Sequence, residues 1–523
     1  MLKKYALFLF IAAAFLCCKK SAKVDEVIPV TPVVTVDSAV LTSVKIEAKN
    51  NVGKITTDIT CTIANGEITA VVPDYKVGKK FALTYAVKNK GTNIKNGDTL
   101  QVSGVTVTDF TKPVTLSVIS KSGVTNTYTV KIKVFTGLPI LYITSASAIV
   151  SKEVYVKGKV VIDANQAYPQ DVTSMTMQIR GHGNSTWTLS AFLKKPYRVK
   201  FDSKISMLGM TAAKNWVLLA NYDDKTLMRN RIAMLLARRL GSDWAPDSRF
   251  VEVVLNGDFV GNYLLTPQVE VNKGRVDINE LTDKNVTDAD NTGGYLLELD
   301  QKRDADVWFN SNKGYPFAVK SPDVPTAKQL AYIKKYIQDT EDAIYAANFT
   351  DPVNGYQKYL NSDSFVNWYL TNEIVQNEDA RLFSSIFYYK DRNGKLGMGP
   401  VWDFDLSGGN IDYTVAKNPT GIWFIRDDGW FLRLAQDPAF IIKVRNRWAA
   451  IKDKEVKQIF TDIDQTAADL KLSQQKNFER WPILNTYVWP NAVVLGSYDK
   501  EVAYYKDFLQ QRINWMDANM SSW

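Results

Sequence analysis

Apolar and polar residues alternate along the first quarter of the chain. The runs 114–118 and 128–134 place apolar side chains at every second position, and a turn at Lys121-Ser122-Gly123 separates them. A period of two is the pattern of strands that bury one face. The sequence therefore predicts a small β-sandwich over residues 39–136, which would serve as a spacer or a binding module.

The pattern changes at Gly137-Leu138-Pro139. Beyond this point, short apolar runs predict strands and longer amphipathic stretches predict helices. We expect one large α+β domain over 137–523 with a helical C-terminal half. The strands are expected at 140–143, 175–180, 197–201, 251–255, 261–265 and 294–299, and helices at 226–240, 327–347, 364–376 and after 437.

The N-terminus has a basic start, an apolar stretch over 5–16, and then Cys17-Cys18. Because this stretch is too short to span a bilayer, it predicts a secretory signal over 1–18. A cysteine at its end suits acylation of Cys17 or Cys18 in a lipoprotein; a plain signal peptide and an uncleaved anchor are the alternatives. Residues 19–38 lack periodicity and predict a tether. We expect secretion across the inner membrane and a lipid anchor in the cell envelope, at the outer membrane.

Composition narrows the function. The chain has 523 residues, is 46% apolar and carries a formal charge of +9. Its basic residues are dispersed, so nucleic acid is not an expected partner. A single histidine, His182, excludes zinc sites that need two. Three cysteines exclude a disulfide-built scaffold.

Two neighbouring segments are candidates for binding phosphate. Residues 180–187 read RGHGNSTW, a loop whose Arg180, Asn184, backbone N–H groups and hydroxyls suit an anion. In the following segment, KKPYRVKF, Lys195 precedes a predicted strand over 197–201, and Arg198 and Lys200 lie on one face of that strand. A cationic row beside a glycine-rich loop favours polyphosphate. The alternatives are a tight turn and a solvated strand face.

Two further residues are candidates for the same ligand. Arg229 lies in the first turn of the helix predicted over 226–240, where a cation opposes the helix dipole, and this suggests a bound acid or phosphate. The alternative is an exposed arginine. Glu298 and Asp300 fall on one face of a predicted strand, where two like charges repel unless a cation lies between them.

The most specific pattern surrounds three aspartates. Asp379 follows a predicted helix and precedes a predicted hairpin, and the hairpin leads into Asp403-Phe404-Asp405. Since the two ends of a hairpin lie close together, we expect Asp379 to meet Asp403 or Asp405 in one site. Phosphoryl transfer needs such carboxylates to orient a hydroxyl and to hold Mg²⁺. An Asx-turn with a surface turn is the alternative.

Taken in order, these motifs resemble the CotH (spore coat protein H) kinase-like family. The resemblance covers about residues 138–447 and depends on the combination of RGHGNSTW, KKPYRVKF, LANYDDKTLMRN, LNGDFVGNYLL, GGYLLELD and NED…GPVWDFDLSGG. It implies an atypical protein-kinase-like fold that uses ATP and Mg²⁺ or Mn²⁺. The implied activity is phosphorylation of Ser or Thr on a partner protein at the surface or in the periplasm. The predicted sandwich over 39–136 resembles the immunoglobulin-like modules of surface lipoproteins.

The resemblance also implies residue roles. Asp379 would be the catalytic-loop aspartate, Asp403 a metal ligand, and Asp405 a second metal ligand in place of a glycine. Lys195 or Lys200 would pair with phosphate. Glu298 would be an ion-pair or metal partner.

Two other functions fit the composition. The 13 Trp and 25 Tyr suit a non-catalytic surface module that binds glycan or protein. Trp423, Trp430, Trp481 and Trp489 are its candidates. A glycosidase would use two carboxylates among Asp403, Asp405 and Glu298, at the separations that such enzymes require.

Overall fold

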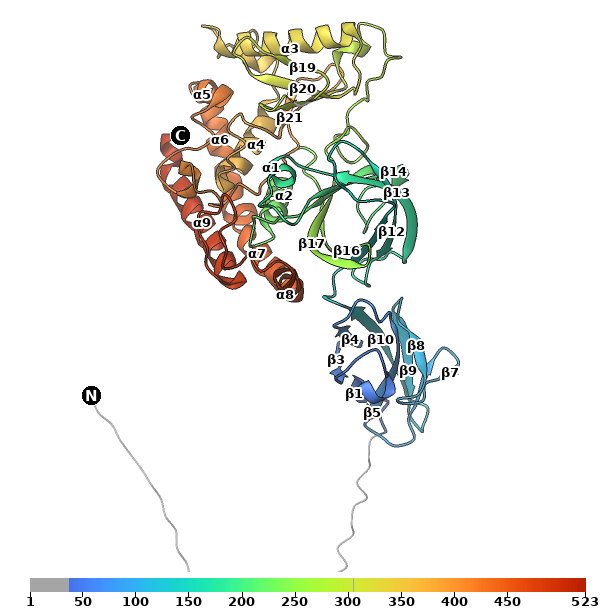
Figure 1. Cartoon of the computed structure of the whole chain (residues 1–523). Coiled ribbons are helices and arrows are strands. Elements are labelled where there is room, and N and C mark those ends of the chain that lie inside the picture. Colours follow the sequence, from blue (N-terminus) through green and yellow to red (C-terminus); the bar gives the residue numbers. More distant parts are fainter. Residues whose placement is uncertain (1–36, 304) are drawn as a thin grey trace, which may run out of the picture.

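A computed structural model describes residues 37–303 and 305–523 (Figure 1). The predicted signal peptide, Cys17, Cys18 and nearly all of the predicted tether lie outside these residues. Within them, no helix is both long enough and apolar enough to cross a membrane. The described chain begins at the far end of a β-rich N-terminal region and continues into a larger region of strands and helices (Figure 1).

The N-terminal region is a sandwich of two sheets, ordered β2-β1-β5-β8 and β3-β4-β10-β9-β6-β7. Alternate residues of β9 and β10, such as Leu116 and Ile132, are buried between the sheets, as the period-two pattern predicts. The strands are β1 Leu41–Ile46, β2 Ile59–Thr60, β3 Thr62–Ala64, β4 Glu67–Val72, β5 Lys80–Val87, β6 Asn93–Asn96, β7 Thr99–Leu100, β8 Val107–Asp109, β9 Val114–Ile119 and β10 Thr125–Val134.

Polar contacts fix the sandwich to the region that follows. The Nζ of Lys79 lies 2.6 Å from a carboxylate oxygen of Asp163. The side-chain amide of Asn165 donates to the carbonyl oxygens of Val134 and Leu138, both at 2.8 Å. Because these groups are mostly buried, they hold the two regions in one orientation.

Seven strands after the sandwich close into a barrel, ordered β11-β12-β13-β14-β15-β17-β16. The sequence predicted several of these strands but not the barrel. Closure depends on the parallel pairing of β11 with β16, between segments more than a hundred residues apart, which no local pattern encodes. The strands are β11 Ile140–Ser145, β12 Val156–Asp163, β13 Thr173–Gly181, β14 Tyr197–Ile205, β15 Ala213–Leu219, β16 Arg249–Leu255 and β17 Asp258–Pro267.

A five-stranded sheet, β19-β20-β18-β21-β22, and most of the helices complete the fold and share one hydrophobic core. The strands are β18 Tyr295–Leu299, β19 Trp308–Asn310, β20 Pro316–Ser321, β21 Ile386–Lys390 and β22 Leu396–Met398. The helices are α1 Ser185–Thr188, α2 Arg229–Arg239, α3 Ala327–Tyr345, α4 Ser362–Val375, α5 Gly429–Leu434, α6 Pro438–Ile451, α7 Gln458–Asp469, α8 Lys471–Arg480 and α9 Tyr498–Asn519.

Candidate active site

A cavity of about 330 Å³ lies where the barrel, the five-stranded sheet and the helices meet. The end of β13 supplies Arg180, the segment after it supplies Asn184, and β18 supplies Glu298. The segments on either side of the β21–β22 hairpin supply Asp379 and Asp403. The structure therefore brings together five predicted residues that are far apart in the sequence.

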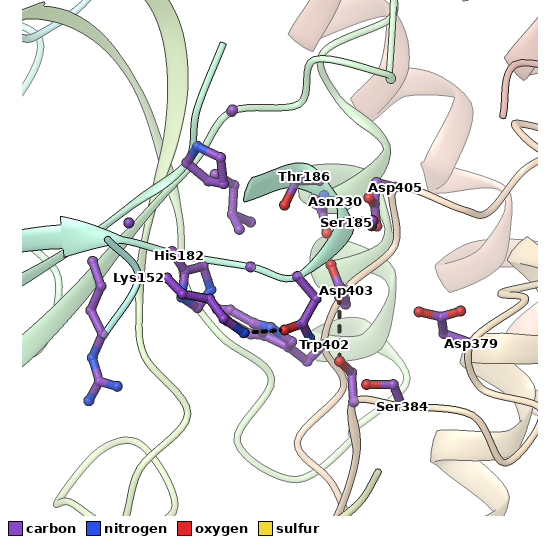
Figure 2. Close-up of a pocket in the computed structure, with 18 of the residues that line it drawn as sticks. Lys152, His182, Ser185, Thr186, Asn230, Asp379, Ser384, Trp402, Asp403 and Asp405 are labelled. Carbon is purple, nitrogen blue, oxygen red and sulfur yellow. Dashed lines mark hydrogen bonds between the residues drawn. The ribbon is translucent and has the colours of Figure 1, made fainter. Parts of the chain in front are cut away.

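The helical side of this cavity is acidic. Asp379, Asp403 and Asp405 line it, as the hairpin argument predicts, and Asp223 joins them from the loop between β15 and α2. Figure 2 shows Asp379, Asp403 and Asp405 on the side of the helices, with Lys152 and His182 on the side of the barrel.

The carboxylates on this side raise one another's pKa. Burial, followed by the charge of Asp403, raises the pKa of Asp379 to about 7. Burial and Asp224 raise the pKa of Asp223 to about 7. Burial and Asp403 also raise the pKa of Asp405 well above its usual value. Like charges in a desolvated site repel one another, so these carboxyl groups favour binding of a proton or a cation. We call Asp223, Asp379, Asp403 and Asp405 the acidic wall.

Hydrogen bonds from three segments hold the turn that carries Asp403: helix α2, the residues just after α4, and the residues just before β21. Asp403 has φ +63°, a left-handed conformation that is uncommon outside glycine. The side-chain amide of Asn377 donates to its carbonyl oxygen at 3.1 Å, and Ser385 Oγ donates to its Oδ2 at 3.4 Å. Asn230 Oδ1 accepts the N–H of Phe404 at 2.8 Å. The surrounding structure thus fixes a strained residue, as functional sites often do.

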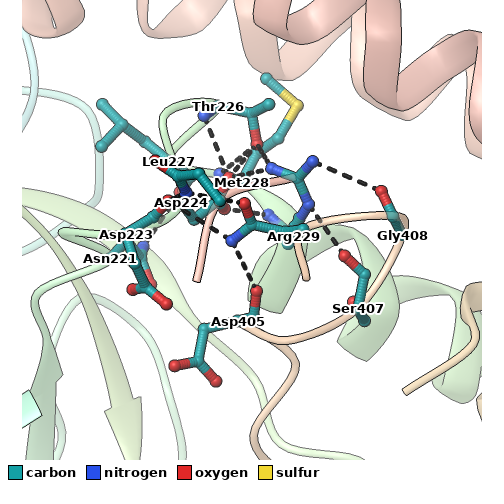
Figure 3. Close-up of polar contacts among 12 residues, drawn as sticks. Asn221, Asp223, Asp224, Thr226, Leu227, Met228, Arg229, Asp405, Ser407 and Gly408 are labelled. Atoms are coloured by element: carbon teal, nitrogen blue, oxygen red, sulfur yellow. Dashed lines mark hydrogen bonds and ion pairs between the residues drawn. The ribbon is translucent and has the colours of Figure 1, made fainter. Parts of the chain in front are cut away.

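Arg229 does not line the cavity, contrary to the sequence-based expectation. Its buried guanidinium forms an ion pair with Asp224, and its Nε donates to the carbonyl oxygen of Ser407 at 3.0 Å (Figure 3). The carboxylate of Asp224 also accepts the N–H of Arg229 at 2.8 Å. The acid that this cation suggested is therefore a residue of the same chain, and the pair ties α2 to the turn after Asp405.

The barrel side of the cavity is cationic. Lys152, Arg180 and Arg198 line it together with His182, and Lys320 extends the positive charge from strand β20 of the five-stranded sheet. We call these residues the cationic wall. Burial, followed by Arg198 and Arg180, lowers the pKa of His182 to about 3, so this imidazole is neutral. The Nζ of Lys152 donates to Asn184 Oδ1 at 2.8 Å.

Arg198 has an unusual environment within the described residues. Among residues 37–303 and 305–523, its Nε is buried without a hydrogen-bond partner, and no carboxylate lies within ion-pair distance of its guanidinium. Desolvation lowers its pKa. A largely buried cation without a partner is costly, and an anion in the cavity would offset that cost.

Lys195 and Lys200, the predicted phosphate-pairing lysines, both lie outside the cavity. Lys195 Nζ donates to the carbonyl oxygens of Trp187 at 2.8 Å and Leu189 at 3.1 Å. Lys200 is exposed, two residues and so about 7 Å beyond Arg198 along β14. The cations that line the cavity are instead Lys152, Arg180, Lys194, Arg198, Lys302 and Lys320.

Glu298 and Asp300 both line the cavity, as expected from their place on one face of a strand. Lys320 of the neighbouring strand β20 forms an ion pair with Glu298, and its Nζ lies 3.1 Å from Glu298 Oε2. The role of Glu298 toward a nucleotide or a metal stays a prediction.

Whether the acidic wall can bind a divalent metal depends on how many ligands the metal takes from the protein. No group of three or more His, Cys, Asp or Glu side chains within the described residues is arranged to hold a metal ion. Mg²⁺ in nucleotide sites takes one or two carboxylates, the rest being phosphate and water oxygens. The acidic wall therefore suits a metal that arrives with a phosphate ligand.

Sequence reasoning missed several cavity residues. Asp223 and Asn230 lie in a segment that was singled out only for Arg229, and Arg198 was seen only as part of a cationic row. Lys152 and Lys320 carried no signal, because they are isolated lysines whose placement depends on the barrel and on the pairing of β18 with β20.

Most of the region that forms the cavity is similar to a known protein family. The family described as CotH kinase protein matches residues 179–516, which is more than half of the chain and includes the acidic wall together with Arg180, Arg198 and Lys320. No curated protein matches the chain.

Proposed function

Because the chain belongs to the CotH kinase protein family, we propose that this cavity transfers phosphate from ATP to Ser or Thr of a partner protein. The observation that carries the proposal is the opposition of an acidic wall, with Asp379 and Asp403, to a cationic wall whose Arg198 has no ion-pair partner among the described residues. A metal-bound polyphosphate has both charges that these walls would bind.

The cationic wall would bind the phosphates. Arg198 offers a planar fork of donors that suits phosphate oxygens, and Arg180, Lys152 and Lys320 add positive charge. Asp403 would hold Mg²⁺ or Mn²⁺, with Asp405 as a second ligand. The metal, when bound, would neutralise charge on the phosphates.

Asp379 is suited to act as the base. Its pKa is raised to about 7, near neutral pH. At that pH a large fraction of such a carboxyl group is ionised, and the ionised form accepts a proton effectively. It would take the proton of the acceptor hydroxyl as the new oxygen–phosphorus bond forms and the bond to the leaving diphosphate breaks. Neutral His182 would donate a hydrogen bond to a phosphate oxygen.

The arrangement supports a kinase-like division of labour. A barrel with cationic side chains would cover the nucleotide, while the helical part would supply the carboxylates (Figure 1). We also propose that the chain is a lipoprotein anchored to the outer membrane, which would give it protein substrates at the surface or in the periplasm.

Transfer of labelled phosphate tests the proposal. The purified chain from residue 37 onward should label a Ser/Thr protein substrate with ATP and Mg²⁺ or Mn²⁺. Asp379→Asn and Asp403→Asn should abolish transfer. Asp464→Asn, a matched change on exposed α7, should retain it. Equal labelling by all variants, or by none of the proteins including wild type, would refute the proposal.

A further inference from the structure

Three exposed aromatic side chains lie together on the surface beside the acidic wall. The rings of Tyr413 and Trp489 are parallel, with centroids 5.8 Å apart. Tyr413 is 53% exposed, Trp489 is 37% exposed and Tyr487 is 52% exposed. By contrast, Trp423 and Trp430 are buried. We call Tyr413, Tyr487 and Trp489 the aromatic platform. Exposed aromatic clusters of this kind mark interaction surfaces.

Hydrogen bonds connect this platform to the residues of the cavity. The side-chain amide of Asn491, two residues after Trp489, donates to the carbonyl oxygen of Asp223 at 2.7 Å. Thr414, next to Tyr413, donates to the carboxylate of Glu378 at 2.7 Å. Glu378 immediately precedes Asp379. The platform therefore has a fixed position next to the carboxylate proposed as the base.

The pKa of Tyr413 also indicates that the aromatic platform lies close to the acidic wall. Burial, followed by the charge of Asp379, raises the pKa of Tyr413 to about 12, and Glu378, Asp405 and Asp412 contribute. The platform thus lies in the field of several carboxylates. An acidic ligand would be repelled there, whereas an uncharged or basic one would not.

Two polar groups of the platform are free to donate. Neither the Tyr413 hydroxyl, which can donate and accept, nor the Trp489 indole N–H, which can only donate, has a hydrogen-bond partner within the described residues. The nearby carboxylate of Asp412 already accepts from Tyr487, at 2.6 Å. A proline-rich backbone presents carbonyl oxygens and lacks N–H groups, so it complements ring faces with free donors.

We propose that the aromatic platform binds a proline-containing segment of the acceptor protein in extended, polyproline II conformation. This inference rests on the proposed function only in calling that segment the acceptor. Proline rings would pack on Tyr413 and Trp489, whose O–H and N–H would donate to backbone carbonyls. A Ser or Thr nearby in the segment would then reach Asp379.

Fluorescence anisotropy tests the proposal without ATP. The chain from residue 37 onward should bind a labelled peptide of repeated Pro-Pro-Thr-Pro units more tightly than a Gly-Ser-Thr-Gly peptide of equal length. Tyr413→Ala and Trp489→Ala should each weaken binding about five-fold or more. Tyr413→Phe, which keeps the ring and removes the donor, should have an intermediate effect. Tyr345→Ala, a similarly exposed tyrosine at the end of α3, is the matched control and should bind normally.

Equal affinity for the two peptides, or unchanged binding by both alanine variants, would overturn the proposal. So would a gluco-oligosaccharide that binds wild type and is lost in the same variants, because the platform would then be a glycan site. Failure of the proposed function is distinguishable. Platform-dependent peptide binding without phosphate transfer would reject the kinase and leave this inference standing.

Discussion

Asn230, the second residue of α2, accepts the backbone N–H of Phe404 at 2.8 Å, although 174 residues separate the two in sequence. The same asparagine donates to Asn221 Oδ1 at 3.2 Å. Because Phe404 follows Asp403 directly, α2 fixes the orientation of the proposed metal ligand. Asn230 is thus a positioning residue for the acidic wall.

Replacing Asn230 by alanine should impair both stability and transfer. The N–H of Phe404 would be buried without a partner, which costs about 1–3 kcal/mol in the free energy of unfolding. A shift of Asp403 by a fraction of an ångström should lower kcat about ten-fold or more. Denaturant titration and steady-state kinetics would measure the two effects. Asn514→Ala, an exposed change on α9, is the matched control. Unchanged kcat in Asn230→Ala would argue against a positioning role.

The buried pair of Arg229 and Asp224 should matter for stability. Arg229→Met would leave a buried, uncompensated carboxylate and should lower the free energy of unfolding by about 3–5 kcal/mol. The double variant Arg229→Met/Asp224→Asn should recover part of the lost stability, because neither side chain of the pair would then carry a charge. Urea denaturation measures both. A single variant as stable as wild type would show that the pair contributes little.

Arg198 and Lys200 offer a matched comparison on one strand. Arg198 lines the cavity and has no ion-pair partner in the part of the chain that the structure describes, whereas Lys200 is exposed outside the cavity. Arg198→Gln should weaken tripolyphosphate binding about ten-fold or more, the effect of losing one charge-assisted contact in a desolvated site. Lys200→Gln should bind as wild type does. Isothermal titration calorimetry provides the measurement, and equal losses in both variants would contradict the assignment of the cationic wall.

Stability should depend on pH through Asp379. Its folded-state pKa of about 7 lies above the ordinary value of 3.8, so the folded state binds more protons than the unfolded state between these values. The free energy of unfolding should therefore fall as pH rises from about 4 to about 7. In EDTA, Asp379→Asn should reduce this slope and be more stable than wild type at pH 8. Parallel pH profiles for the two proteins would contradict a raised pKa.

Activity should change with pH in the opposite direction. A base must be ionised, so the rate of transfer should rise with pH and level off above about pH 7. Initial rates with saturating nucleotide and metal would give the profile. A rate that is constant from pH 5 to 8 would remove Asp379 from proton transfer.

The sequence predicted that Asp379 would meet Asp403 or Asp405 in the acidic wall, because the elements that bring these residues together are local in sequence. A helix, a hairpin and a turn are short-range structures, and antiparallel return of β21 and β22 is enough to bring Asp379 toward Asp403. The alternation along β9 and β10 was likewise sufficient to predict the sandwich strands. Helix α4 also lies close to its predicted range.

The cationic wall was not predictable in the same way. Lys195 and Arg198 are three residues apart, and only the closed barrel decides that Arg198 faces the cavity while Lys195 bonds to backbone carbonyls. The expectation that Arg229 binds a ligand was wrong for a related reason. A cation at a helix N-terminus does imply an acid nearby, but the acid is Asp224, five residues earlier, and no ligand is needed.

Metal-dependent nucleotide binding tests the central claim most directly. Calorimetry should show that wild type binds ATP with Mg²⁺ or Mn²⁺ and binds it about ten-fold or more weakly in EDTA, because the acidic wall then repels the phosphates. Asp403→Asn should lose most of this metal dependence. ATP affinity that is the same with and without metal, or the same in wild type and Asp403→Asn, would contradict a cavity built from opposed acidic and cationic walls.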